Sequence, residues 1–240
     1  MWIKICANTN LDDAQLAAEL GADAVGFVFA PSPRQVTAAQ VSRITPHLPE
    51  TVESVGVFPA LPADQIVSAA LEAGLNTVQL HGGVSLELIR QLDEIFNGQV
   101  KLIQTVHWEI APERTNPERT NPDDPNPAAN TDVARQLQAI AAADLVGRVL
   151  IDSKTAAASG GTGIPFDWNA ARATLAEAAK GLKLIVAGGL REDNVANAIA
   201  RLNPWGVDVA SGVEASPGRK SPEKLAAFIQ AVRNPSQTIR

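Results

Sequence analysis

Two segments near the end of the chain combine a strand-like apolar run with small residues that could bind a phosphate group. Each aliphatic run gives way at once to glycine, alanine or serine, in Leu184–Leu190 (LIVAGGL) and in Gly206–Glu214 (GVDVASGVE). Small residues at the end of a strand leave backbone N–H groups uncovered, and two such ends side by side would surround a phosphate with main-chain donors. The candidate phosphate-binding residues are Gly188, Gly189, Ser211 and Gly212.

Cys6 and Asp152 are candidates for acid–base or nucleophilic chemistry, because each stands at the end of a predicted strand. Asp152 follows the apolar run Val149–Ile151, and a charge at the end of a buried run costs free energy unless it has a partner or a task. A thiol in the position of Cys6 can serve as a nucleophile, as a base or as a small buried apolar group. The position of both residues at strand ends favours function.

Arg34 and two oppositely charged strand residues are candidates for binding or for internal pairing. The planar fork of Arg34 suits a carboxylate, although a solvated arginine is an equally good interpretation. Strand alternation places Lys4 on the same side as Cys6, and Asp208 faces the same way on its own strand. If the first and last strands are neighbours, Lys4 and Asp208 can form an ion pair.

Gln79 and His81 share one face of a further strand and would point into a barrel. A structural role is the ordinary interpretation of His81 unless a ligand lies near. The three histidines are far apart in the sequence, and no group of cysteine and histidine has metal-ligand spacing. We therefore expect no metal.

The elements that must position these residues alternate between strand and helix eight times. We expect strands over Trp2–Cys6, Ala24–Phe29, Val52–Phe58, Thr77–Leu80, Val100–Val106, Arg148–Asp152 and in the two segments described first. We expect helices over 12–20, 63–73, 85–95, 132–143, 168–179 and 222–232, with another opened by the capping-box pair Thr37 and Gln40 and continuing through Leu48. Residues 191–202 connect the last two strands.

Eight alternations in 240 residues favour one α/β domain, a (β/α)8 barrel that spans residues 1–240. A doubly wound sheet would need a glycine-rich turn after the first strand, and Cys6–Asn10 has none. In a barrel, the carboxyl ends of the strands form the active site, and the loops after strands seven and eight form the usual phosphate site. Cys6, Asp152 and the phosphate-binding candidates lie at those ends.

Two loops interrupt this regular pattern. Residues 108–131 contain the near-repeat ERTNP twice, followed by more Asn, Asp and Pro, which predicts a loop insertion that is neither helix nor strand. Gly160–Gly163 follows Asp152; such glycines most often form a turn, and their functional interpretation is a mobile loop that closes over a ligand.

Composition limits the partners of the chain. Twenty basic and 26 acidic side chains give a net charge of -6, and the basic residues are dispersed, so we expect no nucleic-acid partner. A single cysteine cannot form an intrachain disulfide, and no apolar run approaches the length of a membrane span, which favours the cytoplasm and no membrane partner. The expected ligand is a small phosphorylated molecule, and the oligomeric state, monomer or homodimer, stays open.

In order along the chain, these residues resemble the phosphoribosylanthranilate isomerase family of tryptophan biosynthesis, whose members are TIM barrels. The resemblance runs nearly end to end through Lys4–Cys6, Thr9–Asn10, Gly26–Phe29, Ser32–Arg34, Val55–Phe58, Val78–Gly82, Gly160–Gly163, Phe166–Trp168, Ala187–Leu190 and Ser211–Glu214. It implies an Amadori rearrangement of N-(5-phosphoribosyl)anthranilate to 1-(2-carboxyphenylamino)-1-deoxyribulose 5-phosphate, without a cofactor.

The resemblance also implies roles for individual residues. Asp152 matches the general acid of the family, Cys6 its general base and Arg34 the residue that holds the anthranilate carboxylate. The substrate-binding set comprises Arg34, Gln79, His81, Gly188, Gly189, Asp208, Ser211 and Gly212. Two departures stand out: Ala7 replaces the glycine that usually follows the cysteine, and Ala30-Pro31 stands where a lysine is common. Alanine at positive φ would cost roughly 1 kcal/mol.

The implied roles require both groups to leave their ordinary protonation states. Unperturbed pKa values of about 8.5 for cysteine and 3.9 for aspartate favour a thiol and a carboxylate near neutrality, the reverse of what a base and an acid need. We expect burial to raise the pKa of Asp152 and backbone donors or Lys4 to lower that of Cys6.

Two other interpretations remain at this point. A phosphate-binding barrel that has lost its reaction would serve as a binding protein, but the presence of both Cys6 and Asp152 argues against it. A barrel isomerase of histidine biosynthesis would use two aspartates, and a cysteine on the first strand does not fit that pattern.

Overall fold

The computed structural model of the chain describes residues 1–110, 127–154 and 166–234, with the backbone alone for 127–130 and 154. Eight parallel strands close into a barrel in sequence order, and the last strand is hydrogen-bonded to the first. The strands are β1 (Trp2–Ile5), β2 (Ala24–Val28), β3 (Glu53–Phe58), β4 (Thr77–Leu80), β5 (Lys101–Glu109), β6 (Arg148–Lys154), β7 (Lys183–Val186) and β8 (Gly206–Val209).

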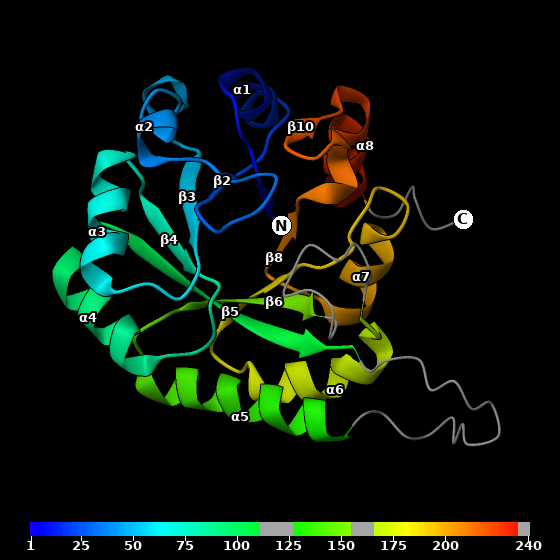
Figure 1. Cartoon of the computed structure of the whole chain (residues 1–240). Helices are drawn as coiled ribbons and strands as arrows, with labels where there is room; N and C mark the ends of the chain where they lie inside the picture. Colours follow the sequence, from blue (N-terminus) through cyan, green and yellow to red (C-terminus); the bar gives the residue numbers. More distant parts are fainter. Residues whose placement is uncertain (111–126, 155–165, 235–240) are drawn as a thin grey trace.

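Helices surround this barrel (Figure 1). They are α1 (Leu11–Glu19), α2 (Ala38–Val41), α3 (Ala63–Glu72), α4 (Leu86–Phe96), α5 (Pro127–Ala143), α6 (Trp168–Ala178), α7 (Val195–Leu202) and α8 (Pro222–Arg233). The predicted (β/α)8 barrel is confirmed. None of the described helices combines the length and apolar character needed to cross a membrane.

Strand alternation divides the apolar side chains into two layers. Ile3 and Ile5 of β1 are fully buried in the larger cluster, which also contains the inner faces of the helices. The smaller cluster comes mainly from the strands and fills the barrel interior with Trp2, Ala24, Val55, Ile103, Leu150, Ile185 and Ala187. Lys4 shares the inward alternation of Trp2 and is fully buried, so the barrel interior contains a charge.

The predicted capping box is present, but the helix that it opens is shorter than predicted. The capping box of Thr37 and Gln40 is present, yet α2 ends at Val41 and a 3₁₀ helix, η1 (Thr45–His47), follows. Pro46 lacks the N–H that a continuing α-helix would use, which explains the break. The glycines that follow three of the helices, namely Gly21, Gly74 and Gly181, all have positive φ.

The predicted loop insertion over 108–131 is wrong at both ends. β5 runs to Glu109 in register with β6, and α5 begins at Pro127. The strand continues because Trp108 packs inside the protein: it is 5% exposed and stacks on Phe166 with ring centroids 5.4 Å apart. Residues 111–126 and the predicted Gly160–Gly163 loop lie outside the described residues.

A short ribbon follows β8 that the sequence patterns do not predict. The chain forms a 3₁₀ helix, η3 (Ser211–Val213), and then two antiparallel strands, β9 (Glu214–Ser216) and β10 (Arg219–Lys220). Gly218, with φ 80°, lies in the turn between them. Strands of two and three residues are too short for their alternation to be read, and this ribbon brings two charged side chains to the mouth of the barrel.

The packing of Trp108 predicts a large loss of stability when the indole is removed. Trp108→Ala should lower the free energy of unfolding by about 3–5 kcal/mol, because it deletes a buried aromatic side chain and leaves a cavity against Phe166. Ile95→Ala, at a residue 55% exposed, is the control and should change it by less than about 1 kcal/mol. Urea denaturation compares them, and equal effects would contradict a core role for Trp108.

Candidate active site

A cavity of about 760 Å³ opens among the carboxyl ends of the strands and the loops that follow them. The ten residues proposed from the sequence all line it: Cys6, Arg34, Gln79, His81, Asp152, Gly188, Gly189, Asp208, Ser211 and Gly212. They come from six different strands or the loops that follow them. The fold therefore gathers residues far apart in the sequence around one space large enough for a small molecule.

Cys6 follows β1 and is held by backbone and by space left on the neighbouring strand. Its N–H donates to the carbonyl of Val209, at 2.8 Å. Gly26 of β2 makes room for the thiol, because a Cβ there would lie 2.8 Å from Cys6 Sγ and 3.0 Å from Lys4 Cε. Ala7 has φ 62°, so the backbone does adopt the left-handed conformation that glycine would suit better.

The expected lowering of the Cys6 pKa is wrong, because the pKa is raised. Burial raises the pKa of the thiol, and the nearby Asp208 carboxylate adds to the rise. The positive charges of Lys4 and Lys220 oppose that change but do not outweigh burial. Cys6 therefore exists mainly as a thiol near neutral pH.

Asp152, on β6, has the environment of a carboxylic acid that keeps its proton. Burial, together with the negative charge of Asp208, raises its pKa to about 7, against opposing effects from the Ser153 backbone N–H and from Lys4. The expected direction is confirmed. His81 Nε2 lies 3.9 Å from Asp152 Oδ2, and burial lowers the pKa of His81 to about 4, so this imidazole is neutral near pH 7.

Lys4 and Asp208 form the predicted ion pair across the closure of the barrel. They are partners in the register of β1 and β8, and Lys4 Nζ donates to Asp208 Oδ1 at 2.9 Å. Burial by itself would lower the pKa of Lys4, but Asp208 and Cys6 outweigh it and raise the pKa overall. Lys4 is thus a permanent positive charge beneath the cavity.

The histidines are not all separate, contrary to what their sequence spacing suggests. His107 on β5 is the register partner of Asp152, and its ring lies edge-on to His81 with centroids 4.8 Å apart. Ligand atoms of His81, His107 and Asp152 lie within 4.8 Å of one another, a separation that a metal ion could bridge. The predicted strand ended at Val106, one residue before His107, which is why the sequence did not reveal it.

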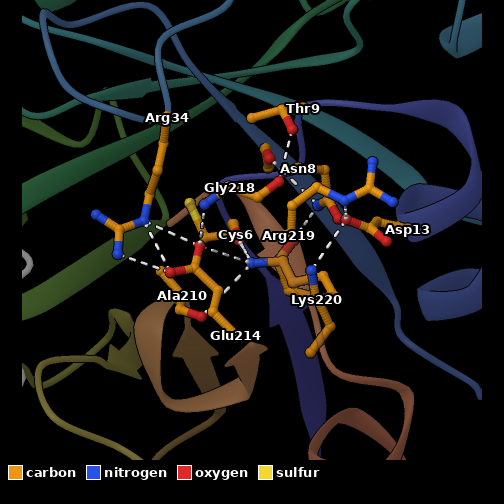
Figure 2. Close-up of polar contacts among 12 residues, drawn as sticks. Cys6, Asn8, Thr9, Asp13, Arg34, Ala210, Glu214, Gly218, Arg219 and Lys220 are labelled. Atoms are coloured by element: carbon orange, nitrogen blue, oxygen red, sulfur yellow. Dashed lines mark hydrogen bonds and ion pairs between the residues drawn. The ribbon is translucent and has the colours of Figure 1, made fainter. Parts of the chain in front are cut away.

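Arg34, in the loop after β2, is already held by a carboxylate of the chain. Its Nε donates to Glu214 Oε1 at 2.9 Å and Oε2 at 3.0 Å, and its Nη2 donates to Oε2 at 2.6 Å (Figure 2). Burial tends to raise the pKa of Glu214, but the hydrogen bonds from Arg34 and the charge of Lys220 lower it overall. Among the described residues, no hydrogen-bond partner is found for Nη1 of this guanidinium, which could therefore bind a ligand.

The loops after β7 and β8 pack so closely against neighbouring backbone that two of their positions have room only for glycine. Gly188 has φ 84°, and a Cβ there would collide with Ser153 Oγ and approach the Ser153 N atom at 2.7 Å. A Cβ at Gly212 would overlap the carbonyl oxygen of Leu190. η3 begins directly after β8, which matches the short extra helix at the phosphate site of many barrels.

Gln79 presents an acceptor in the cavity. It is buried, and its Nε2 donates to Thr105 Oγ1 at 3.1 Å. Its Oε1 has no hydrogen-bond partner in the described parts of the chain. A buried polar atom without a partner is costly, so a ligand that donates to it would be stabilised.

The closed barrel, with acid–base side chains and small-residue loops around one cavity at its carboxyl end, defines a (β/α)8-barrel enzyme. The family model described as N-(5'phosphoribosyl)anthranilate (PRA) isomerase matches residues 3–118 and 126–231. The chain belongs to this family.

Relatives and solved structures agree with this assignment. The N-(5'-phosphoribosyl)anthranilate isomerase of Pelobacter propionicus is 36% identical over 232 residues, which cover 96% of this chain and 95% of the relative. That of Citrifermentans bemidjiense is 38% identical over 229 residues, covering 95% and 94%. The crystal structure of the Thermotoga maritima phosphoribosyl anthranilate isomerase has 34% identity and a TM-score of 0.78, covering 98% of this chain and 99% of that one.

The raised pKa of Asp152 predicts a pH-dependent effect of neutralising it. The folded protein holds this proton up to about pH 7, whereas an unfolded aspartate loses it near 3.9. The stability that Asp152 contributes is therefore present at low pH and lost as the pH rises toward 7. Relative to wild type, Asp152→Asn should gain roughly 2–3 kcal/mol in unfolding free energy between pH 5 and pH 8. Urea denaturation of both proteins at the two pH values measures this, and a pH-independent difference would contradict the shift.

Proposed function

We propose that the protein carries out the Amadori rearrangement of its family, with Asp152 as the general acid and Cys6 as the general base. The observation that carries this assignment is the presence of two ionisable groups at one cavity: a carboxyl with a pKa near 7, and a thiol beside two lysine charges that oppose the effect of burial. The two groups come from β1 and β6, which are not neighbours in the barrel, so they can act on different atoms of one substrate.

The reaction needs an acid first. Asp152 donates its proton to the ring oxygen of the ribose as the bond from C1 to that oxygen breaks, which opens the ring and leaves a protonated Schiff base at C1. The positive charge on the nitrogen makes the hydrogen on C2 acidic. Cys6, as thiolate, accepts this proton, and its departure gives an enolamine. Protonation at C1 and loss of the hydroxyl proton at C2 complete the ketone product.

The two protonation states required occur together only over a limited pH range. Asp152 loses its proton above about pH 7, and Cys6 ionises only at higher pH because burial raises its pKa. The active form, with Asp152 neutral and Cys6 ionised, is a minor fraction of the free protein. Its amount rises to a maximum between the two pKa values, so turnover at limiting substrate follows a bell-shaped pH profile.

Binding groups surround the two reacting positions. We assign the substrate carboxylate to the open side of Arg34 and the phosphate to Gly188, Gly189, Ser211 and Gly212. A crystal structure of a phosphoribosyl anthranilate isomerase in complex with reduced 1-(o-carboxyphenylamino)-1-deoxyribulose 5-phosphate, 32% identical to this chain with a TM-score of 0.74, supports a ligand of this chemistry. Asp208, Gln79 and His81 complete the set of residues that we expect to face the sugar.

The assignment of acid and base is tested by following anthranilate fluorescence in single-turnover reactions. Cys6→Ser and Asp152→Asn should each lower the rate by roughly 10²- to 10⁴-fold, as expected for loss of a general acid or base. Both variants should still bind the reduced product analogue, because the phosphate loops and Arg34 are untouched. Near-normal turnover in either variant would remove that residue from the assigned role.

The same assay separates the alternatives. A binding protein that has lost its reaction would show ligand binding but no turnover in the wild type. We also expect full activity in buffer that contains EDTA, because no step above uses a metal, and loss of activity would assign a function to the cluster of His81, His107 and Asp152.

We place the protein in the cytoplasm, as a monomer or a homodimer. One related crystal structure is of mutually generated monomers of the dimeric phosphoribosylanthranilate isomerase from Thermotoga maritima. Either state is compatible with the site, because every residue assigned to it comes from one chain.

The contact assigned to Arg34 predicts an effect mainly on binding. Arg34→Ala should raise KM by about 10- to 100-fold with a smaller change in kcat, since a paired carboxylate contact is made before and during the reaction. Arg34→Lys is the matched control, because it keeps the charge but not the planar fork. Its KM should lie between those of the wild type and Arg34→Ala. Steady-state kinetics decide, and an unchanged KM in Arg34→Ala would exclude the contact.

A further inference from the structure

Lys220 is a buried charge that the reaction above does not use. It lies on β10, in the ribbon after β8, and its side chain is 0% exposed. Burial lowers the pKa of Lys220, while Glu214 and Cys6 oppose that change. A fully buried lysine is costly to maintain unless its ammonium group has partners.

The partners of the Lys220 ammonium group belong to the base and to the ribbon. Nζ donates to the carbonyl oxygen of Cys6 at 2.5 Å, lies 3.5 Å from the carbonyl oxygen of Ala210 and 3.5 Å from Glu214 Oε1. Figure 2 shows this nitrogen between Cys6 and the Glu214 carboxylate, which also holds Arg34. The buried ammonium group of Lys220 thus contacts the backbone of Cys6, the proposed base.

The contact with the Cys6 carbonyl falls on a strained turn. The carbonyl belongs to the peptide group that links Cys6 to Ala7, and Ala7 has φ 62°, which is unfavourable for any residue with a Cβ. A hydrogen bond to a charged donor fixes the orientation of that peptide group. The direction in which the Cys6 side chain leaves the backbone depends on the same peptide.

The ribbon that carries Lys220 is hydrogen-bonded to the loop after β1 and to the start of α1. The N–H of Lys220 donates to Asp13 Oδ2 at 3.0 Å, and Thr9 Oγ1 donates to the carbonyl of Gly218 at 2.6 Å. Glu214 accepts from the Gly218 N–H at 3.2 Å. The ammonium group is therefore held in place from several directions rather than by its own side chain alone.

Charged groups face Cys6 from several elements. Lys4 lies on β1, which Cys6 follows, Asp208 lies on β8, Lys220 on β10 and Arg34 in the loop after β2. Lys4 is neutralised at close range by Asp208, with a separation of 2.9 Å, whereas Lys220 is 3.5 Å from its carboxylate partner. Lys4 has the largest lowering effect on the pKa of the thiol and Asp208 opposes it, while Lys220 adds a smaller effect of the same sign as that of Lys4.

We propose that Lys220 is a positioning residue for the base: its ammonium group holds the Cys6 carbonyl in the left-handed turn and supplies a positive charge that favours the thiolate. This proposal rests on the assignment of Cys6 as the base. It is separable from that assignment, because the ionisation of Cys6 can be measured without any substrate.

The composition of the chain makes this measurement unusually direct. The chain has one cysteine and no tyrosine. Absorbance near 240 nm as a function of pH therefore reports Cys6 thiolate, without the tyrosinate signal that normally obscures it at high pH. The decisive variant is Lys220→Gln, which keeps a hydrogen-bond donor and removes the charge.

Lys220→Gln should raise the midpoint of the Cys6 titration by about one pH unit. It should also lower kcat by about tenfold or more and change KM by less than about threefold, because Arg34 and the phosphate loops keep their places. Lys224→Gln is the control: Lys224 is exposed, donates to the Glu214 carbonyl oxygen at 3.0 Å and does not face Cys6. It should leave both the titration and the turnover as in the wild type.

An unchanged thiol titration in Lys220→Gln would overturn the proposal, even if turnover fell, since that result would reveal a merely structural lysine. If Lys220→Gln does not fold, Lys220→Met combined with Glu214→Gln leaves no buried carboxylate unpaired, and its thiol titration must show the same rise. Failure of the proposed function has a different signature: the wild type would lack isomerase activity while the Lys220 effect on Cys6 ionisation persisted.

Discussion

The buried ion pair between Lys4 and Asp208 is the interaction on which the polar chemistry of this barrel depends. It closes the barrel between β1 and β8 and lies beneath the cavity, where its two charges act on both proposed catalytic groups. Asp208 raises the pKa of Asp152 and of Cys6, and Lys4 lowers both. Removing either partner would leave an uncompensated buried charge, at a cost of about 3–5 kcal/mol, and would shift acid and base together.

The barrel places Asp152 and Cys6 in different electrostatic surroundings, although both are affected by the Lys4–Asp208 pair. Asp152 lies on a strand where burial and a neighbouring carboxylate act in one direction, so it retains a proton near neutrality. Cys6 is equally buried but lies beside two lysines, one inside the barrel and one on the ribbon after β8. A single fold thereby keeps an acid protonated while limiting the cost of ionising a base a few strands away.

Some features of the site follow from strand register alone, and these could be predicted from the sequence. The pairing of Lys4 with Asp208 could be predicted, on the condition that both face the interior, because closure of the barrel makes the first and last strands neighbours. The capping box at Thr37 could be predicted for a different reason, because its geometry depends only on neighbouring residues. The family pattern raised a positive φ at Ala7 as a possibility, and the structure shows it, with φ 62°.

The features that could not be predicted depend on tertiary contacts that have no local signature in the sequence. The strand end at His107 was missed because its continuation is stabilised by packing of the next residue, Trp108. The ribbon that carries Lys220 is too short to show a pattern. The net pKa of Cys6 could not be predicted, since it is a balance between desolvation and charges from separate elements, and burial proved the larger effect.

The barrel holds Asp152 as a neutral acid close to physiological pH. Carbon-13 NMR of protein labelled at the aspartate carboxyl carbons, with the Asp152 signal assigned by its absence in Asp152→Asn, measures this directly. We expect this carboxyl to titrate with a midpoint near pH 7 in the ligand-free protein. A midpoint near the ordinary aspartate value of about 4 would contradict it.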